Sequence, residues 1–264
     1  MTDVSRARGG AAAGLPHTQR RSRSAHDVVL RGLGSAIVSG KIPVGAMLPN
    51  KDELSRQFGV SHTSLREALQ TLSAKGLIAA KTKIGTWVQE ESHWNMFDAD
   101  ILAWRLAKGA DPRFVSGLFE IRQAFEPAAA ASAALRRTDA HLTELRCHLE
   151  AMGGAAADKQ RFTDADLAFH LCVLDASGNP FMRSIGALIA TALVASFTLS
   201  APTDSAELTA NAYRQHGAIV EAIAAQSPQA ATDAMLEVIR QGWTTYSGLS
   251  DRPLANLALH RVLT

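Results

Sequence analysis

Three side chains have types and spacing that could bind a metal ion. Asp166 and His170 are four residues apart in a helical pattern, so both side chains project from the same face of that helix. A histidine from another helix could complete the site, and His216 is the candidate. The three would supply ligands to a Zn, Ni or Mn ion and leave positions open for water or for oxygens of a ligand. The alternative is an ordinary polar pair of Asp166 with His170, and a His216 that is satisfied in the interior.

Arg122 is the candidate for binding an anion directly. Its guanidinium group can donate two parallel hydrogen bonds to a carboxylate. The alternative is a salt bridge with Glu120 or Glu126, which the spacing along a helix also allows.

Charge is unevenly distributed along the chain. Residues 1–90 contain 13 Lys and Arg against 6 Asp and Glu, whereas the remaining residues contain 14 against 19. A basic first third and an acidic remainder indicate that one part of the chain meets a polyanion while the rest does not.

Three helices are predicted in the basic first third. The first begins at about His26, the second at the capping pair Asn50 and Glu53, and the third after the N-cap Ser61. The core-facing positions of the first and third helices are Leu30, Leu33, Ile37, Leu65, Ala68, Leu69 and Leu72.

A tight turn and a hairpin complete this domain. Gly59 turns the chain between the second and third helices, and two short strands are predicted at 77–80 and 86–88. Three helices followed by a basic hairpin are typical of a winged helix-turn-helix, which we assign to residues 26–90.

The third helix would present polar residues to a DNA duplex. With its apolar stripe buried, His62, Thr63, Arg66 and Gln70 fall on or near the outer face. Arg66 could donate two hydrogen bonds to a guanine or hold a phosphate. The alternative, that these are merely solvated helix residues, is disfavoured by the basic hairpin and arm beside them.

The remainder of the chain is predicted to be helical. The predicted helices are 98–107, 112–135, 139–153, 159–177, 180–199, 206–225 and 228–247. We therefore expect a mainly α fold, in which a winged helix-turn-helix precedes an antiparallel α-helical bundle. The expected organisation is a disordered basic arm (1–25), the winged domain (26–90), a linker (91–97), the helical domain (98–248) and a tail (249–264).

The sequence predicts neither a membrane span nor a disulfide. It contains no apolar run of about eighteen residues, and its N-terminal stretch lacks the apolar core of a signal peptide. Cys147 and Cys172 have no C-x-x-C spacing and are interpreted as buried apolar fillers. We expect a cytoplasmic protein.

The first third resembles the DNA-binding domain of the GntR family. The matching blocks are Leu48–Ser55, Gly59–Leu69, Gly76–Leu77 and Gly85–Val88, in the order and spacing of the family. The resemblance implies a domain that binds a double-stranded DNA operator, with Thr63, Arg66 and the Gly85 turn in contact with DNA.

Two positions depart from the pattern of the family. Many members have Arg where His62 stands, and Arg is common where Asp52 stands. The lack of both guanidinium groups should weaken the binding of DNA or change the base sequence that is recognised. Lys51, Lys81 and Lys83 can compensate through contacts with phosphates. The residues expected at DNA are Lys51, Ser61, His62, Thr63, Ser64, Arg66, Lys81, Lys83 and Gly85.

The helical part resembles the FCD ligand-sensing domain of the FadR subfamily. Its marks are Glu120-x-Arg122-x-x-x-Glu126-Pro127, Asp166 with His170, the Ala176–Asn179 turn, and His216 followed by Ile219, Ala222 and Ile223. The segment Trp94–Trp104 looks like the galactonate-repressor branch. Members of the subfamily are homodimers that typically repress catabolic operons and release DNA when a carboxylate metabolite binds. The resemblance therefore implies a homodimer that responds to a small carboxylate such as a sugar acid.

The same resemblance implies where the effector binds. The expected effector residues are Arg122, Asp166, His170, Asn179 and His216. Metal-binding FCD domains hold a divalent ion with an Asp or Asn and three His, but the last His falls near Val238 here, and Val cannot coordinate. Three protein ligands to the metal ion would remain. When the effector binds at this site, it would shift the helices that position the two winged domains of the dimer.

Two other functions are compatible with parts of the sequence. A metal-dependent hydrolase could use Asp166, His170 and His216 as a catalytic zinc site, but the chain lacks H-E-x-x-H and an obvious general base. A fatty acyl-CoA could be the effector, but an acyl groove has no use for a buried hydrophilic cluster.

Overall fold

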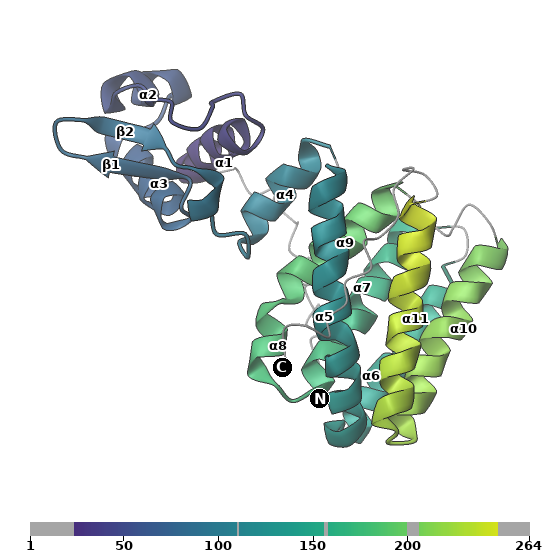
Figure 1. Cartoon of the computed structure of the whole chain (residues 1–264). Coiled ribbons are helices and arrows are strands. Elements are labelled where there is room, and N and C mark those ends of the chain that lie inside the picture. Colours follow the sequence, from purple (N-terminus) through teal and green to yellow (C-terminus); the bar gives the residue numbers. More distant parts are fainter. Residues whose placement is uncertain (1–23, 110, 156–157, 200–205, 248–264) are drawn as a thin grey trace, which may run out of the picture.

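The computed structural model describes residues 24–109, 111–155, 158–199 and 206–247. Figure 1 shows a small N-terminal domain on one side of helix α4 and a bundle of helices on the other. The expected tail (249–264) lies outside the described residues, as does the expected basic arm except for Ser24 and Ala25, which cap and begin α1.

The N-terminal domain contains the three predicted helices, and the second and third have the predicted caps. Helix α1 spans Ala25–Val38, α2 spans Lys51–Phe58 and α3 spans His62–Ala74. Asn50 and Glu53 form the predicted capping box, and the Ser61 hydroxyl accepts a hydrogen bond from the Ser64 N–H. Gly59 adopts φ 63° between α2 and α3, the left-handed conformation that ends α2 and turns the chain.

The core of this domain buries one side of α3. Leu65, Ala68 and Leu72 are fully buried against α1, while Leu69 is half-buried. Because the apolar stripe faces inward, the polar residues of the first turns of α3 face outward.

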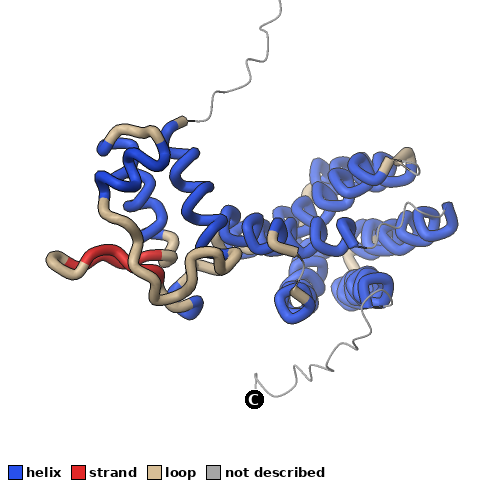
Figure 2. Tube along the Cα trace, turned by 90° about the horizontal axis from the view of Figure 1, so that it is seen from above, coloured by secondary structure: helices blue, strands red, loops and turns tan. Residues whose placement is uncertain are grey.

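The predicted hairpin is present and is shifted by about one residue. Strand β1 (Ile78–Lys81) pairs antiparallel with β2 (Gly85–Val88), from Ile78 opposite Val88 to Lys81 opposite Gly85. Figure 2 shows the hairpin extending away from the helices as a wing.

Helix α4 (Ala99–Ala107) connects the two parts and contacts both α1 and α9. The expected linker contains a 3-10 turn, η1 (Glu91–His93). Trp104 of α4 lies so close to Gly34 of α1 that a Cβ on Gly34 would be 2.2 Å from the indole. The absence of a side chain at Gly34 therefore allows α4 to pack against the winged domain.

The remaining helices form the antiparallel bundle. They are α5 (Pro112–Arg136), α6 (Asp139–Gly153), α7 (Lys159–Ala176), α8 (Pro180–Ser184), α9 (Gly186–Leu199), α10 (Ala206–Ala224) and α11 (Pro228–Ser247). One boundary differs from prediction: the helix expected over 180–199 is interrupted at Ile185 and becomes α8 and α9.

Cysteine burial corrects one expectation. Cys172 is buried, and burial with the nearby Glu144 carboxylate raises the pKa of its thiol to about 12, which makes it unreactive. Cys147 is exposed on α6, so the prediction that both cysteines are buried is wrong for Cys147.

Among the described helices, none has the length and apolar character needed to cross a membrane.

Candidate functional site

One candidate site is the exposed face of α3 and the wing. His62, Thr63 and Arg66 are exposed in the first turns of α3. Lys51 is exposed at the start of α2, and Lys81, Lys83 and Gly85 are exposed in the wing. Side chains that can bind phosphates and base edges therefore lie on a recognition helix and its neighbouring elements.

Two of the residues expected at DNA have a local role. The Ser61 hydroxyl caps α3 and lies 3.1 Å from the Ser64 hydroxyl. Their first contribution is therefore to hold the N-terminal turn of α3, which positions Thr63 and Arg66.

Asp52 and His62, the two residues that depart from the pattern of the family, lie next to each other. Asp52, in the first turn of α2, is 3.7 Å from His62 Nε2, and the two side chains are 81% and 65% exposed. The sequence predicted His62 at DNA and showed Asp52 only as a departure from the family pattern. It contained no signal for this contact, which joins two different helices.

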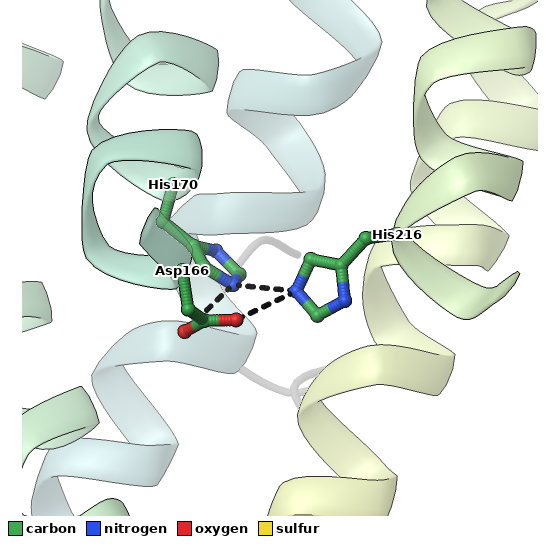
Figure 3. A group of neighbouring side chains, drawn as sticks. All are labelled: Asp166, His170 and His216. Carbon is green, nitrogen blue, oxygen red and sulfur yellow. Dashed lines mark hydrogen bonds and ion pairs between the residues drawn. The ribbon is translucent and has the colours of Figure 1, made fainter. Parts of the chain in front are cut away.

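The second candidate site is a buried cluster between α7 and α10 (Figure 3). His216 Nε2 lies 2.9 Å from Asp166 Oδ1 and 3.4 Å from His170 Nε2. His170 Nε2 lies 3.9 Å from Asp166 Oδ2, and each of these side chains is at most 4% exposed. The structure thus brings together the three predicted metal ligands, with one ligand atom from each within 4.8 Å of the others.

Both imidazole rings are oriented as metal ligands usually are. His216 Nδ1 lies 2.8 Å from the Ala212 carbonyl and His170 Nδ1 lies 2.5 Å from Glu126 Oε2. An acceptor oxygen beside Nδ1 keeps a proton on that nitrogen, so Nε2 is the nitrogen that can give up its proton to coordinate a metal ion. In both rings Nε2 is the atom that faces Asp166.

Asp166 completes the donor set as a charged group. Burial alone raises the pKa of Asp166, but the charges of His170, His216 and Arg122 and a hydrogen bond from His216 outweigh it and lower that pKa below its ordinary value. Asp166 Oδ2 is buried without a hydrogen-bond partner among the described residues. A buried carboxylate oxygen without a hydrogen-bond partner and two imidazole nitrogens that can become ligands fit a divalent cation.

Glu126 is a site residue that the sequence suggested only as a partner for Arg122. Its Oε1 accepts a hydrogen bond from Arg122 Nε at 2.6 Å, so the alternative considered for Arg122, a salt bridge, is present and is made with Glu126. Burial alone raises the pKa of Glu126, but Arg122 and His170 outweigh it and hold that pKa at about 2. The contact with His170 joins α5 to α7, and the spacing of residues in the sequence could not predict it.

A cavity of about 70 Å³ opens beside the cluster. Arg122, Asp166, His170 and His216 line it together with Val238, so Arg122 is available to a ligand despite its salt bridge. Its other polar lining residues are Asn211, Gln215, Gln241 and Thr245. None of these four was predicted; Asn211 and Gln215 are one turn apart on α10, as are Gln241 and Thr245 on α11.

Asn179 lies apart from the other residues expected to bind the effector. It is not among the residues that line this cavity. Its side chain caps α8 by accepting a hydrogen bond from the Phe181 N–H. A short polar side chain before a helix-initiating proline is a good N-cap, and this explains Asn179 without a ligand.

Comparison with known proteins agrees with both sites. Residues 27–88 match the family described as bacterial regulatory proteins, gntR family, and residues 117–241 match the FCD domain. The galactonate operon transcriptional repressor of Escherichia coli (strain K12) is 34% identical over 213 residues, which are 81% of this chain and 93% of that protein. The regulator LutR of Bacillus subtilis (strain 168) is 32% identical over 76% of this chain and 91% of its own length.

A solved structure supports the fold independently of close sequence identity. Lar, which controls expression of the Listeria monocytogenes agr system, superposes with a TM-score of 0.60 at 22% identity, covering 87% of this chain and 100% of that one. The two family matches and the full-length relatives set aside the hydrolase alternative. The chain therefore belongs to the GntR family of bacterial transcription regulators, in the FadR-like group with an FCD domain, and it is a DNA-binding regulator rather than an enzyme.

Proposed function

We propose that this regulator is a homodimeric repressor of an operon for sugar-acid catabolism, which a small carboxylate effector releases from its operator. The observation that carries the proposal is the cavity in which Arg122 lies beside the Asp166, His170 and His216 cluster. The relative named as the galactonate operon repressor supports an aldonate as the first effector to test. The operator DNA lies in the cytoplasm, which is where we expect the protein to act.

A divalent cation, Zn, Ni or Mn, is proposed at the buried cluster. Asp166 Oδ1 or Oδ2, His170 Nε2 and His216 Nε2 would hold it. When bound, the ion supplies concentrated positive charge and open coordination positions for the oxygens of the effector. Val238 lines the same cavity, and since its side chain offers no ligand, the α11 side of the cluster is left to the effector.

The lining of the cavity favours a polyhydroxy monocarboxylate. Apart from the two histidines, Arg122 is the cationic side chain among the described lining residues, and it matches one carboxylate group. Amide and hydroxyl side chains on α10 and α11 can bind the hydroxyl groups of a sugar acid. A long acyl chain would be placed against buried charge and amides in a small cavity, which disfavours an acyl-CoA effector.

Release of DNA would follow from a change in the relative position of the two winged domains of the dimer. Two recognition helices must sit one turn of DNA apart to bind a palindromic operator. Helix α4 contacts both α1 of the winged domain and α9 of the bundle, so a shift of the bundle helices would reach the winged domain through α4. An effector that distinguishes the two conformations would typically change operator affinity by about 5–150-fold.

The experiment measures operator binding by the full-length protein and its response to effectors. A thermal-shift screen covers aldonates, hexuronates, small hydroxy acids and acyl-CoAs, and each compound that stabilises the protein is added to a promoter-fragment binding assay. We expect an aldonate or hexuronate to stabilise the protein and to release the fragment. Stabilisation by acyl-CoA alone, or failure of every stabilising sugar acid to change DNA binding, would overturn the proposed effector.

Arg66→Ala tests the DNA face in the same assay. Arg66 is exposed on α3, so its removal should cost about 1–3 kcal/mol of operator affinity without loss of folding. Arg146→Ala, which removes an exposed arginine from α6 in the bundle, is the matched control and should bind as the parent does. Parent-like retardation by a folded, dimeric Arg66→Ala protein would refute the assignment of α3 to the major groove.

A further inference from the structure

We infer that Glu126 is a positioning residue, which joins the anion-binding Arg122 and the metal-ligating His170 into one unit. The inference rests on the proposed metal and effector site and adds how that site is held. Arg122 and Glu126 are one turn apart on α5, and His170 lies on α7, which packs against α5.

The two oxygens of the Glu126 carboxylate lie close to two different side chains. Oε1 is 2.6 Å from Arg122 Nε, and Oε2 is 2.5 Å from His170 Nδ1. The side chains of all three residues are at most 3% exposed, so water does not compete for these contacts. A carboxylate that contacts a guanidinium group and an imidazole in a dry interior restricts the orientation of both.

For His170, the contact selects which ring nitrogen faces the cluster. Since Nδ1 is the ring nitrogen that lies beside the carboxylate, Nε2 is on the side of Asp166 and of His216 Nε2, which is 3.4 Å away. In His216, too, Nε2 faces the cluster, because Nδ1 contacts a neutral acceptor, the carbonyl oxygen of Ala212. A carboxylate partner makes an imidazole a stronger ligand than a carbonyl partner does, so His170 should depend on Glu126 for both orientation and basicity.

For Arg122, the contact decides which part of the guanidinium group can meet the effector. Nε is engaged by Glu126, and the face of the group lies over the Phe119 ring at 5.5 Å. The two terminal amino groups remain as donors, and Arg122 lines the cavity. Glu126 therefore holds the guanidinium group in the orientation that a carboxylate ligand needs.

The decisive experiment compares zinc binding by the parent, Glu126→Gln and Glu120→Gln, each as the full chain without effector. Glu120 lies on the same helix outside this bridge, so its substitution is the matched control. Zinc affinity is measured by competition with a chromophoric chelator at one pH. We expect Glu126→Gln to bind zinc about 10–100-fold more weakly, as is typical when the partner of a ligating histidine is lost, and Glu120→Gln to bind as the parent does.

A second measurement separates positioning from a merely structural role. In ¹⁵N-histidine-labelled, metal-free parent protein, His170 should carry its proton on Nδ1, whereas Glu126→Gln should show a mixture of tautomers. A purely structural role would lower the Tm of the metal-free protein and leave the zinc affinity and the tautomer unchanged. Glu126→Asp, whose shorter side chain cannot span both partners, is expected to weaken zinc binding in the same way and serves if Glu126→Gln does not fold.

The outcomes distinguish this inference from the function on which it rests. Parent-like zinc affinity in folded Glu126→Gln or Glu126→Asp overturns the positioning role alone. Absence of zinc binding by the parent overturns the proposed metal site, and the inference with it.

Discussion

At the scale of single residues, Asp52 places a negative charge on the face that we assign to DNA. Its carboxylate is 81% exposed and lies 3.7 Å from the His62 imidazole. A carboxylate repels phosphates, so it lowers affinity for any duplex, while it can accept a hydrogen bond from cytosine in the major groove. This pair therefore favours discrimination between sequences over general affinity for DNA.

Asp52→Asn should strengthen binding to unrelated DNA. We expect an increase of about two- to tenfold at about 0.1 M salt, because one repulsive charge is removed, with a smaller gain on the operator. Fluorescence anisotropy with operator and scrambled duplexes measures both affinities, and Asp164→Asn on α7 of the bundle controls for the change in net charge. An unchanged ratio of the two affinities would show that Asp52 has no part in discrimination.

Val238 occupies a position where a fourth metal ligand would be effective. It is 7% exposed and lines the cavity beside the cluster. Val238→His should raise zinc affinity by about tenfold or more, since a fourth ligand closes the coordination sphere, and should weaken effector binding for the same reason. Val238→Phe fills similar space without a ligand atom, so equal zinc affinities of the two variants would contradict the prediction.

The residues of the site were only partly predictable from their spacing. Asp166 and His170 share a face because they are one turn apart, and Arg122 with Glu126 follow the same rule. Two features of the site depend on how the helices pack. Glu126 of α5 contacts His170 of α7, and Asn179 caps α8 away from the cavity. Sequence spacing describes neighbours on one helix and says little about which faces of different helices meet.

At the scale of elements, α4 is held to α1 by a contact that requires glycine. Gly34 lies under the indole of Trp104, and a Cβ there would be 2.2 Å from the ring. The helix period predicted both α1 and α4, but the pattern of neither helix indicates that they touch.

Gly34→Ala should destabilise the protein by about 1–3 kcal/mol, because the indole must move to accommodate the methyl group. Gly117→Ala, in α5, is the matched control: its Cβ would meet nothing within 4 Å, so the exchange should be neutral or stabilising by up to about 1 kcal/mol. Urea unfolding of both variants measures the difference. Equal stabilities would mean that α4 does not pack on α1 as described.

Helix and strand boundaries followed the sequence closely, with two differences. The helix expected at 180–199 breaks at Ile185, and the hairpin strands are displaced by about one residue. A glycine stands at each of these boundaries, Gly186 at the start of α9 and Gly85 at the start of β2, but a glycine in the sequence does not by itself fix the residue at which an element begins.

At the scale of the whole molecule, Lys75 links the two functional halves. It caps the C-terminal end of α3, and its ammonium group lies 2.6 Å from Asp98 Oδ2 and 2.8 Å from Asp100 Oδ2 at the start of α4. The Lys75 side chain is 12% exposed. This charge cluster ties the recognition helix to the helix that contacts the bundle, so we expect it to transmit effector binding to the winged domain.

Lys75→Met should cost about 2 kcal/mol of stability and reduce the release of operator by the effector, with effector affinity retained. Burial lowers the pKa of Lys75, but hydrogen bonds to Asp100 and Asp98 outweigh it and raise that pKa above its ordinary value of 10.5. A raised pKa means that the stabilisation is fully present below pH 10.5 and is lost as the pH rises through the pKa of the folded state.

Unfolding of the parent and Lys75→Met over a range of pH checks the prediction. The difference in unfolding free energy should be constant from about pH 7 to 9.5 and should shrink above pH 10.5. Lys108→Met, at the exposed end of α4, is the control and should show little difference at any pH. A constant difference at high pH would mean that packing of the Lys75 chain, and not its charge, stabilises the contact.

Local patterns in the sequence predicted the helices, the caps at Asn50 and Ser61 and the hairpin, because these depend on residues within one or two turns of each other. The order and spacing of the motifs indicated the family. The tertiary structure alone decided that Glu126 bridges Arg122 and His170, that Asp52 faces His62, that four polar residues of α10 and α11 line the cavity, and that Asn179 does not. Each of these depends on how helices far apart in the chain pack against one another. That arrangement minimises the free energy of the whole core, so no local pattern records it.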